Sequence, residues 1–141
     1  MTKIFNQIKD IAFAFDKEAF VERSLHLSFI IYKGRIISIG QNSKKTHPIN
    51  LRNPRINKEG VNISNIKGSC SEWGAISRLR NLTNIPSAKC SLINIRINKL
   101  NEIRMSQPCS SCRNLIRYQG FKNVWFSNET GTFEKYDVET V

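Results

Sequence analysis

Three cysteines and one glutamate have the residue types and spacing of a metal site that does chemistry. Cys109 and Cys112 form a Cys-x-x-Cys pair, and Cys70 stands two residues before Glu72, far upstream. Three thiolates fill three positions of a tetrahedral zinc ion and leave the fourth open, which a catalytic site requires. A carboxylate beside the open position can move protons for a bound water molecule. The pattern therefore favours a catalytic zinc site.

Two other interpretations of these cysteines remain open. A closed structural zinc site takes four protein ligands, and His47 is the best candidate for the fourth. A thioredoxin-like redox pair would use Cys109 and Cys112 but would leave Cys70 and Glu72 without a role. Cys90 has no paired spacing and stands in an apolar stretch, so we expect it to be a packed residue.

The composition is that of one compact domain spanning residues 1–141. The chain is 40% hydrophobic and contains eight Phe, enough for a real core. No apolar run reaches the roughly 18 residues of a membrane helix, and the N-terminus lacks the pattern of a secretory signal. Cysteines in a ligand-like pattern fit a reducing compartment better than a disulfide framework. We therefore expect a cytoplasmic protein that does not bind membranes.

The charge is strongly positive. The formal net charge is +11, and such a surface attracts anions such as nucleotides, nucleic acids or acidic partners. The alternative is that the basic residues merely keep a small protein soluble. The charge thus narrows the class of partner without identifying it.

Hydrophobic periodicity predicts an α/β fold. Apolar residues at helical spacing over 4–23 precede two runs that read as a hairpin. Residues 41–69 form a long polar, basic loop, and helices then alternate with strands, which implies parallel pairing with right-handed crossovers. We expect a single three-layer α/β/α domain with a mixed sheet of about five strands and helices on both faces. The predicted helices are 4–23, 71–80 and 110–118, and the predicted strands are 25–32, 35–40, 91–97, 124–126 and 132–136.

Both cysteine motifs fall at the starts of predicted helices. Cys109 and Cys112 straddle the first turn of one helix, where a spacing of three brings their sulfurs to one side. A helix N-terminus also lowers thiol pKa values and favours thiolates. Cys70 opens the other helix, and Glu72 lies in its first turn, near a metal without having to bind it.

With these motifs the chain resembles the cytidine deaminase-like zinc superfamily. That class carries His or Cys, one residue and Glu, followed later by Pro-Cys-x-x-Cys, which matches Cys70-Ser71-Glu72 and Pro108-Cys109-Ser110-Ser111-Cys112. Gly40-Gln41-Asn42 resembles the Gly-x-Asn that ends the family's second strand, and Glu72-Trp73-Gly74-Ala75-Ile76 resembles its Glu-x-x-Ala-Ile helix. Ser106-Gln107-Pro108 and Gly120-Phe121-Lys122-Asn123-Val124 fit the segments around the second motif. The likeness covers roughly residues 25–136 and is closest to small viral members of the deoxycytidylate deaminase group.

The resemblance implies a role for each matched residue. Cys70, Cys109 and Cys112 would hold Zn²⁺, and Glu72 would carry protons from the attacking water to the ring nitrogen and the leaving amine. Asn42 would bond a sugar hydroxyl. The Ser71 backbone would face the base carbonyl, and the Ser106 carbonyl would accept from the exocyclic amine.

One departure from the family bears on the substrate. Free cytidine deaminases with three cysteine ligands place an Arg after the Glu to offset the thiolate charge, and here that residue is Trp73. Helix N-termini and Arg113 would have to supply the compensation.

The expected activity is zinc-dependent hydrolytic deamination of a cytosine nucleotide or nucleoside, above all dCMP. Arg52 and Arg55, together with Lys58, are candidates to grip the phosphate. The alternatives are a deaminase acting on unpaired bases of single-stranded nucleic acid, for which Trp73, Trp125 and Tyr118 are the available aromatics, and a non-catalytic zinc module that binds nucleotide. We also expect a homo-oligomer, located in the host cytoplasm if the protein is viral.

Overall fold

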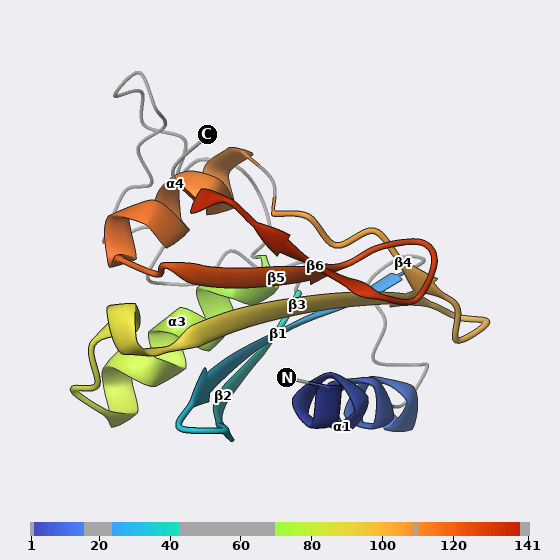
Figure 1. Cartoon of the computed structure of the whole chain (residues 1–141), viewed down its shortest axis with the longest axis horizontal. Helices are drawn as coiled ribbons and strands as arrows, with labels where there is room; N and C mark the ends of the chain where they lie inside the picture. Colours follow the sequence, from blue (N-terminus) through green and yellow to red (C-terminus); the bar gives the residue numbers. More distant parts are fainter. Residues whose placement is uncertain (1, 16–23, 43–69, 109, 139–141) are drawn as a thin grey trace.

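The structure, a computed structural model, describes residues 2–15, 24–42, 70–108 and 110–138 (Figure 1). Among them, no helix is long and apolar enough to cross a membrane. The long basic segment expected at 41–69 lies outside the described residues from 43 onward.

A mixed sheet forms the middle layer. Its strands follow the order β2-β1-β3-β5-β6, and β4 pairs with β3 beside this path. β3 and β5 run parallel, as the helix–strand alternation predicted, and the other pairs are antiparallel. The strands are β1 (Ser24–Tyr32), β2 (Arg35–Gln41), β3 (Ser91–Asn98), β4 (Ile103–Arg104), β5 (Asn123–Ser127) and β6 (Phe133–Tyr136).

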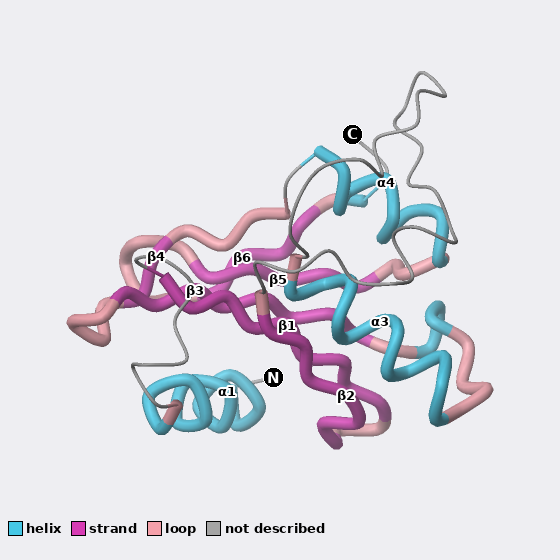
Figure 2. The backbone as a smooth tube through the Cα atoms, turned by 180° about the vertical axis from the view of Figure 1, so that it is seen from behind, coloured by secondary structure: helices cyan, strands magenta, loops and turns pink. Residues whose placement is uncertain are grey.

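Helices cover both faces of this sheet, as expected. Figure 1 shows α1 on one side of the strands and α3 and α4 on the other, and the reverse view in Figure 2 agrees. The fold is thus the predicted α/β/α arrangement. The helices are α1 (Thr2–Ala14), α3 (Ser71–Leu82), the short 3₁₀ helix η2 (Ser87–Lys89) and α4 (Ser110–Gln119).

Two details differ from the sequence prediction. The first helix ends at Ala14, whereas the spacing predicted a helix to residue 23; residues 16–23 lie outside the described part. The short strand β4 was not predicted, and it brings the sheet to six strands within the part of the chain that the structure describes. Its two residues pair with Arg96 and Ile97 of β3, too short a segment to show an alternating pattern.

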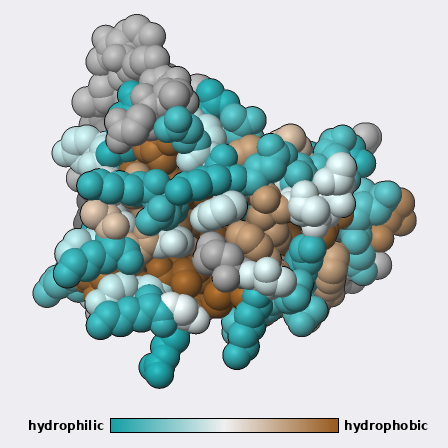
Figure 3. Space-filling view, viewed as in Figure 1, coloured by the Kyte–Doolittle hydropathy of each residue, from teal (hydrophilic) through white to brown (hydrophobic). Residues whose placement is uncertain are grey.

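Alternation along the central strands builds two separate cores. In β1, Leu25, Leu27 and Phe29 pack with α1, whereas Ile30 packs with α3 and α4. β3 repeats this division, with Ile93 and Ile95 on the α1 side and Leu92 on the other. The period of two in a strand sends neighbouring side chains to opposite faces. On the outside, Figure 3 shows mostly hydrophilic residues on one face of the molecule, with hydrophobic ones between them.

Candidate active site

The first turn of α3 carries two of the predicted functional residues. Cys70 is the N-cap of this helix, in extended backbone conformation, and Glu72 is the acidic residue of its first turn. Glu72 is 5% exposed, and Cys70 is partly exposed. An ionisable side chain this deeply buried is rarely found without hydrogen-bonding or metal partners. The local prediction for this motif, a helix that starts just after Cys70, is confirmed.

The first turns of α4 supply the second motif. Cys112 is fully buried in the core that contains α3 and α4. The Nε of Arg113 donates a hydrogen bond of 3.0 Å to the carbonyl oxygen of Pro108, which ties the helix to the chain just before it. Cys109, which the sequence places among the ligands, lies outside the described residues.

The fold brings these two motifs together. One ligand atom each from Cys70, Glu72 and Cys112 lies within 4.8 Å of the others. Two sulfurs and a carboxylate at such distances fit zinc, which accepts thiolate and carboxylate ligands in tetrahedral sites. The expected meeting of the two cysteine motifs is therefore observed for the described cysteines, and the donor set suits the metal that the sequence suggested.

Hydrogen bonds hold both oxygens of the Glu72 carboxylate. The Nδ2 of Asn94 donates to Oε2 at 3.0 Å, and the Oγ of Ser71 donates to Oε1 at 3.1 Å. Asn94 and Ser71 are 3% and 2% exposed, so these contacts are formed away from water. Hydrogen bonds to a charged group are about twice as strong as neutral ones, and they fix the plane of the carboxylate.

A further serine links these two donors. The Oγ of Ser28, fully buried in β1, donates to the Oδ1 of Asn94 at 2.7 Å and lies 2.7 Å from the Oγ of Ser71. Ser28 and Asn94 are direct partners across the β1–β3 pair. The sequence reasoning missed both residues. The available signal was a polar side chain inside an apolar strand, as in Leu27-Ser28-Phe29 and Ile93-Asn94-Ile95.

Ser106 lies at the edge of the same network. Its carbonyl oxygen is 3.4 Å from the Nδ2 of Asn94, the nitrogen that also contacts Glu72. Its hydroxyl donates to the Asn94 carbonyl at 2.9 Å, and the Ser127 amide donates back to that hydroxyl at 2.7 Å. The unpredicted strand β4 ends two residues before Ser106, so it delivers this carbonyl to the neighbourhood of Glu72.

Asn42 closes the end of the β1–β2 hairpin. Its side-chain oxygen accepts a hydrogen bond of 3.1 Å from the backbone amide of His26, and its backbone amide donates to the His26 carbonyl at 3.1 Å. His26 itself is partly buried in β1. The other proposed substrate or ligand contacts, namely His47, Arg52, Arg55 and Lys58, lie outside the described residues.

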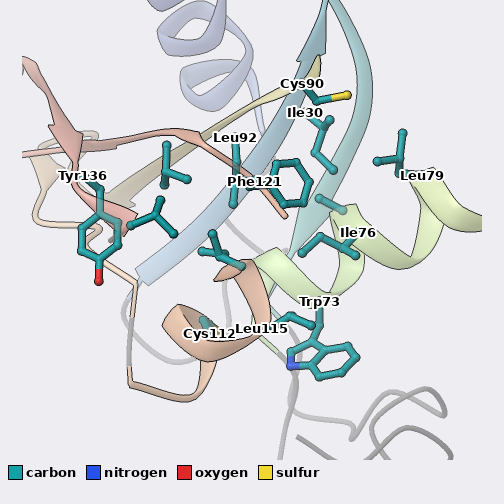
Figure 4. Packing of buried hydrophobic residues seen from close by; sticks show 14 of the residues in the cluster. Ile30, Trp73, Ile76, Leu79, Cys90, Leu92, Cys112, Leu115, Phe121 and Tyr136 are labelled. Carbon is teal, nitrogen blue, oxygen red and sulfur yellow. The ribbon is translucent and has the colours of Figure 1, made fainter. Parts of the chain in front are cut away.

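Cys90 is a packed residue and not part of this group, as predicted. It is fully buried, and in Figure 4 it lies at the opposite end of the hydrophobic cluster from Cys112. Burial raises the pKa of the Cys90 thiol, an effect that the positive charge of Arg80 partly offsets. A neutral thiol of this kind behaves as a small hydrophobic side chain.

Trp73, Trp125 and Tyr118 do not form a common platform for bases. Trp73 is 3% exposed and belongs to the core around α3 and α4 (Figure 4). Trp125 packs edge-to-face on Phe5 of α1, in the core on the other face of the sheet. Tyr118 is exposed on α4. Stacking of successive bases needs aromatic rings exposed along one groove, so these three residues give no support to single-strand binding.

Arg113 makes a second contact beyond the Pro108 carbonyl. Its guanidinium lies over the ring of Tyr136, 5.8 Å from the centroid. Burial raises the pKa of Tyr136, while the charges of Arg113 and Arg117 lower it and Asp137 raises it. Arg113 thus links α4 to β6 through its contact with Tyr136. Compensation of thiolate charge by Arg113 stays a prediction.

No family model matches the chain, and no curated protein matches its sequence. Among solved structures, the apo dCMP deaminase of the cyanophage S-TIM5 is similar with a TM-score of 0.60 and 18% identity, over 92% of this chain and 86% of that one. The same enzyme in complex with dCMP and dUMP gives a TM-score of 0.59 and 16% identity, over 91% and 83%. The chain therefore shares its fold with this dCMP deaminase.

Proposed function

We propose that the protein is a zinc-dependent hydrolytic deaminase that converts a cytosine nucleotide, in the first place dCMP, to the uracil form with release of ammonia. The observation that carries this proposal is the Glu72 carboxylate, buried within 4.8 Å of two cysteine ligand atoms. The cytosine nucleotide class is supported by the fold shared with a dCMP deaminase that has been crystallised with dCMP and dUMP.

The proposed ligands are Cys70, Cys112 and Cys109. Zinc held by these residues would act as a Lewis acid and make water a nucleophile near neutral pH. Glu72 is grouped with the cysteines, and a carboxylate can also serve as a ligand. We assign it the proton-carrying role because Asn94 and Ser71 already orient its two oxygens.

In the proposed reaction, Glu72 accepts a proton from the attacking water and passes protons to the ring nitrogen and the leaving amine. Water adds to the carbon that bears the amine, and that carbon–nitrogen bond then breaks to give ammonia and a carbonyl. The Ser106 carbonyl is proposed to accept a hydrogen bond from the amine. The Ser106 carbonyl and the Glu72 carboxylate both contact the Nδ2 of Asn94, which supports this placement.

The substrate contacts outside this centre are proposed from the sequence. Asn42 would bind a sugar hydroxyl, and Arg52 and Arg55 would bind the 5′ phosphate. The net charge of +11 is compatible with an anionic substrate.

The deciding experiment is an activity panel on zinc-loaded protein with dCMP, dCTP, cytidine and single-stranded oligonucleotides. Deamination of dCMP well above that of the other three supports the proposal. Turnover of the oligonucleotide alone would replace it with a nucleic-acid deaminase, and zinc binding without turnover of any substrate would replace it with a non-catalytic nucleotide-binding module.

A further inference from the structure

We propose that Asn94 is a positioning residue for proton transfer, which holds the Glu72 carboxylate in place and is itself held by Ser28. This inference rests on the proposed function, since it concerns the residue to which proton transfer is assigned. It adds two residues that neither the cysteine motifs nor the deaminase resemblance points to.

Asn94 is placed to orient two parts of the site with one group. Its Nδ2 contacts Glu72 Oε2 at 3.0 Å and the Ser106 carbonyl oxygen at 3.4 Å. An amide NH₂ has two hydrogens in fixed directions, so it can serve both acceptors at once. Asn94 thereby sets the separation between the Glu72 carboxylate and the Ser106 carbonyl, which is proposed to accept a hydrogen bond from the amine. A displacement of about 1 Å at a reacting group can cost a large factor in rate.

Asn94 is the more tightly fixed of the two donors to Glu72, because the two side chains differ in the hydrogens that they can donate. The Ser71 hydroxyl has one hydrogen and two neighbours that can accept it, Glu72 Oε1 at 3.1 Å and the Ser28 Oγ at 2.7 Å. Its donation to Glu72 is therefore shared. Asn94 cannot turn in the same way, because Ser28 donates to its Oδ1 at 2.7 Å and fixes which end of the amide faces Glu72.

Polar side chains at these two positions of the sheet cost free energy without a function that needs them. Ser28 and Asn94 face the same core as Ile30 and Leu92, which lie two residues away on the same strands. Apolar side chains suit such positions, and replacing a satisfied buried polar pair with apolar groups is often neutral or stabilising. Local departures from the apolar pattern tend to mark functional sites. The polar pair therefore points to catalysis rather than to stability.

The test compares Asn94→Leu with a matched control in the zinc-loaded protein. Ser38→Ala is the control. Ser38 is a buried β2 residue whose hydroxyl donates to the Ala75 carbonyl of α3, the helix that carries Glu72, but away from Glu72 itself. Asn94→Leu should lower kcat for dCMP by about 10- to 100-fold, as loss of a hydrogen bond to a charged group implies. KM and zinc content should stay within about twofold. Ser38→Ala should leave kcat unchanged.

Two further variants separate positioning from general damage. Ser28→Ala keeps the Asn94 amide but removes the hydroxyl that orients it, so it should lower kcat by less than Asn94→Leu, again without changing KM. In a Glu72→Asp background, the shortened carboxylate no longer reaches Asn94, and adding Asn94→Leu should cost little more. Equal losses in both backgrounds, or an Asn94→Leu enzyme with parental kcat, would overturn the positioning role while leaving the deaminase assignment intact.

A readout that does not depend on activity is the side-chain amide signal of Asn94 in a ¹⁵N NMR spectrum. Glu72→Gln should shift this signal strongly, and Ser38→Ala should not. If the parent deaminates none of the four substrates, the proposed function fails and the catalytic role of Asn94 fails with it. An Asn94 signal that ignores Glu72→Gln in an active enzyme would overturn the positioning role alone.

Discussion

The backbone of Gly40 lies directly against that of Ser71. A Cβ added at Gly40 would come within 2.1 Å of the Ser71 carbonyl oxygen and 2.2 Å of the Ala75 amide nitrogen. Gly40 pairs with Ser28 across the β1–β2 hairpin, and Ser28 pairs with Asn94 across β1–β3. One row of the sheet, with a glycine and two small polar residues, thus forms the surface on which the first turn of α3 rests.

Gly40→Ala should push the start of α3 away from the sheet, because the added methyl group would overlap backbone atoms of that helix. We expect most bound zinc and nearly all deaminase activity to be lost, measured by metal analysis and by dCMP turnover. Gly34→Ala is the control: it strains a left-handed turn with φ of 75° but meets nothing within 4 Å. It should lower the unfolding temperature and keep zinc. Parental zinc content in Gly40→Ala would contradict this account.

Metal analysis of protein purified without chelator should give one zinc per chain. X-ray absorption at the zinc edge should show three sulfur neighbours near 2.3 Å and one lighter ligand, as expected for three cysteines with an open position. Cys112→Ser should lose the metal, and Cys90→Ser, which changes a cysteine remote from the site, should keep it. Two sulfurs and two lighter atoms would instead make Glu72 a ligand.

Glu72→Gln should abolish dCMP deamination and leave zinc content and unfolding temperature near the parental values. General acid–base catalysis contributes about 10²–10⁴-fold, and a group that serves several proton steps should exceed that range. The amide keeps the size of the carboxylate, so packing beneath α3 is preserved. Activity within a few fold of the parent would remove Glu72 from the mechanism, and loss of zinc would assign it to the metal.

The Cys90 thiol should stay unmodified when the folded protein is treated with iodoacetamide near neutral pH, because the reactive form is the thiolate and burial raises the pKa of this thiol. Its contribution to stability is complete below the ordinary thiol pKa and is lost as the pH rises through the higher folded-state pKa. Urea unfolding at alkaline pH should therefore show a smaller decline in Cys90→Ala than in the parent. An equal decline in both would place the titrating group elsewhere.

Replacing Arg52 and Arg55 together with Ala should weaken turnover of dCMP far more than any turnover of deoxycytidine, because only the nucleotide offers a phosphate. Loss of one charge-assisted contact predicts about tenfold or more in the ratio of kcat/KM values. Equal losses on both substrates would mean that these arginines do not bind phosphate. A salt-sensitive loss of oligonucleotide binding would favour nucleic acid as the substrate.

Much of the local structure could be predicted from the sequence, because local patterns determine it. The sequence predicts helices at residues 71–80 and 110–118, and both are present as α3 and α4. Directly after α4, Gly120 has a φ of 87°, a conformation that glycine adopts at little cost. The hairpin follows from Lys33-Gly34 between two apolar runs. β4 was missed because two residues carry no period, although this strand brings Ser106 to Asn94.

The sequence by itself determined the chemistry available: which residues can bind a metal, and that Cys70 and Glu72 share the start of a helix. Only the tertiary structure decided what surrounds them. Ser28 and Asn94 are 66 positions apart and meet because of the register between β1 and β3. A shift of one residue in that register would turn one of the two side chains to the α1 face and separate the pair. Strand register depends on packing across the whole sheet, so no local pattern could have shown that these two residues lie beneath Glu72.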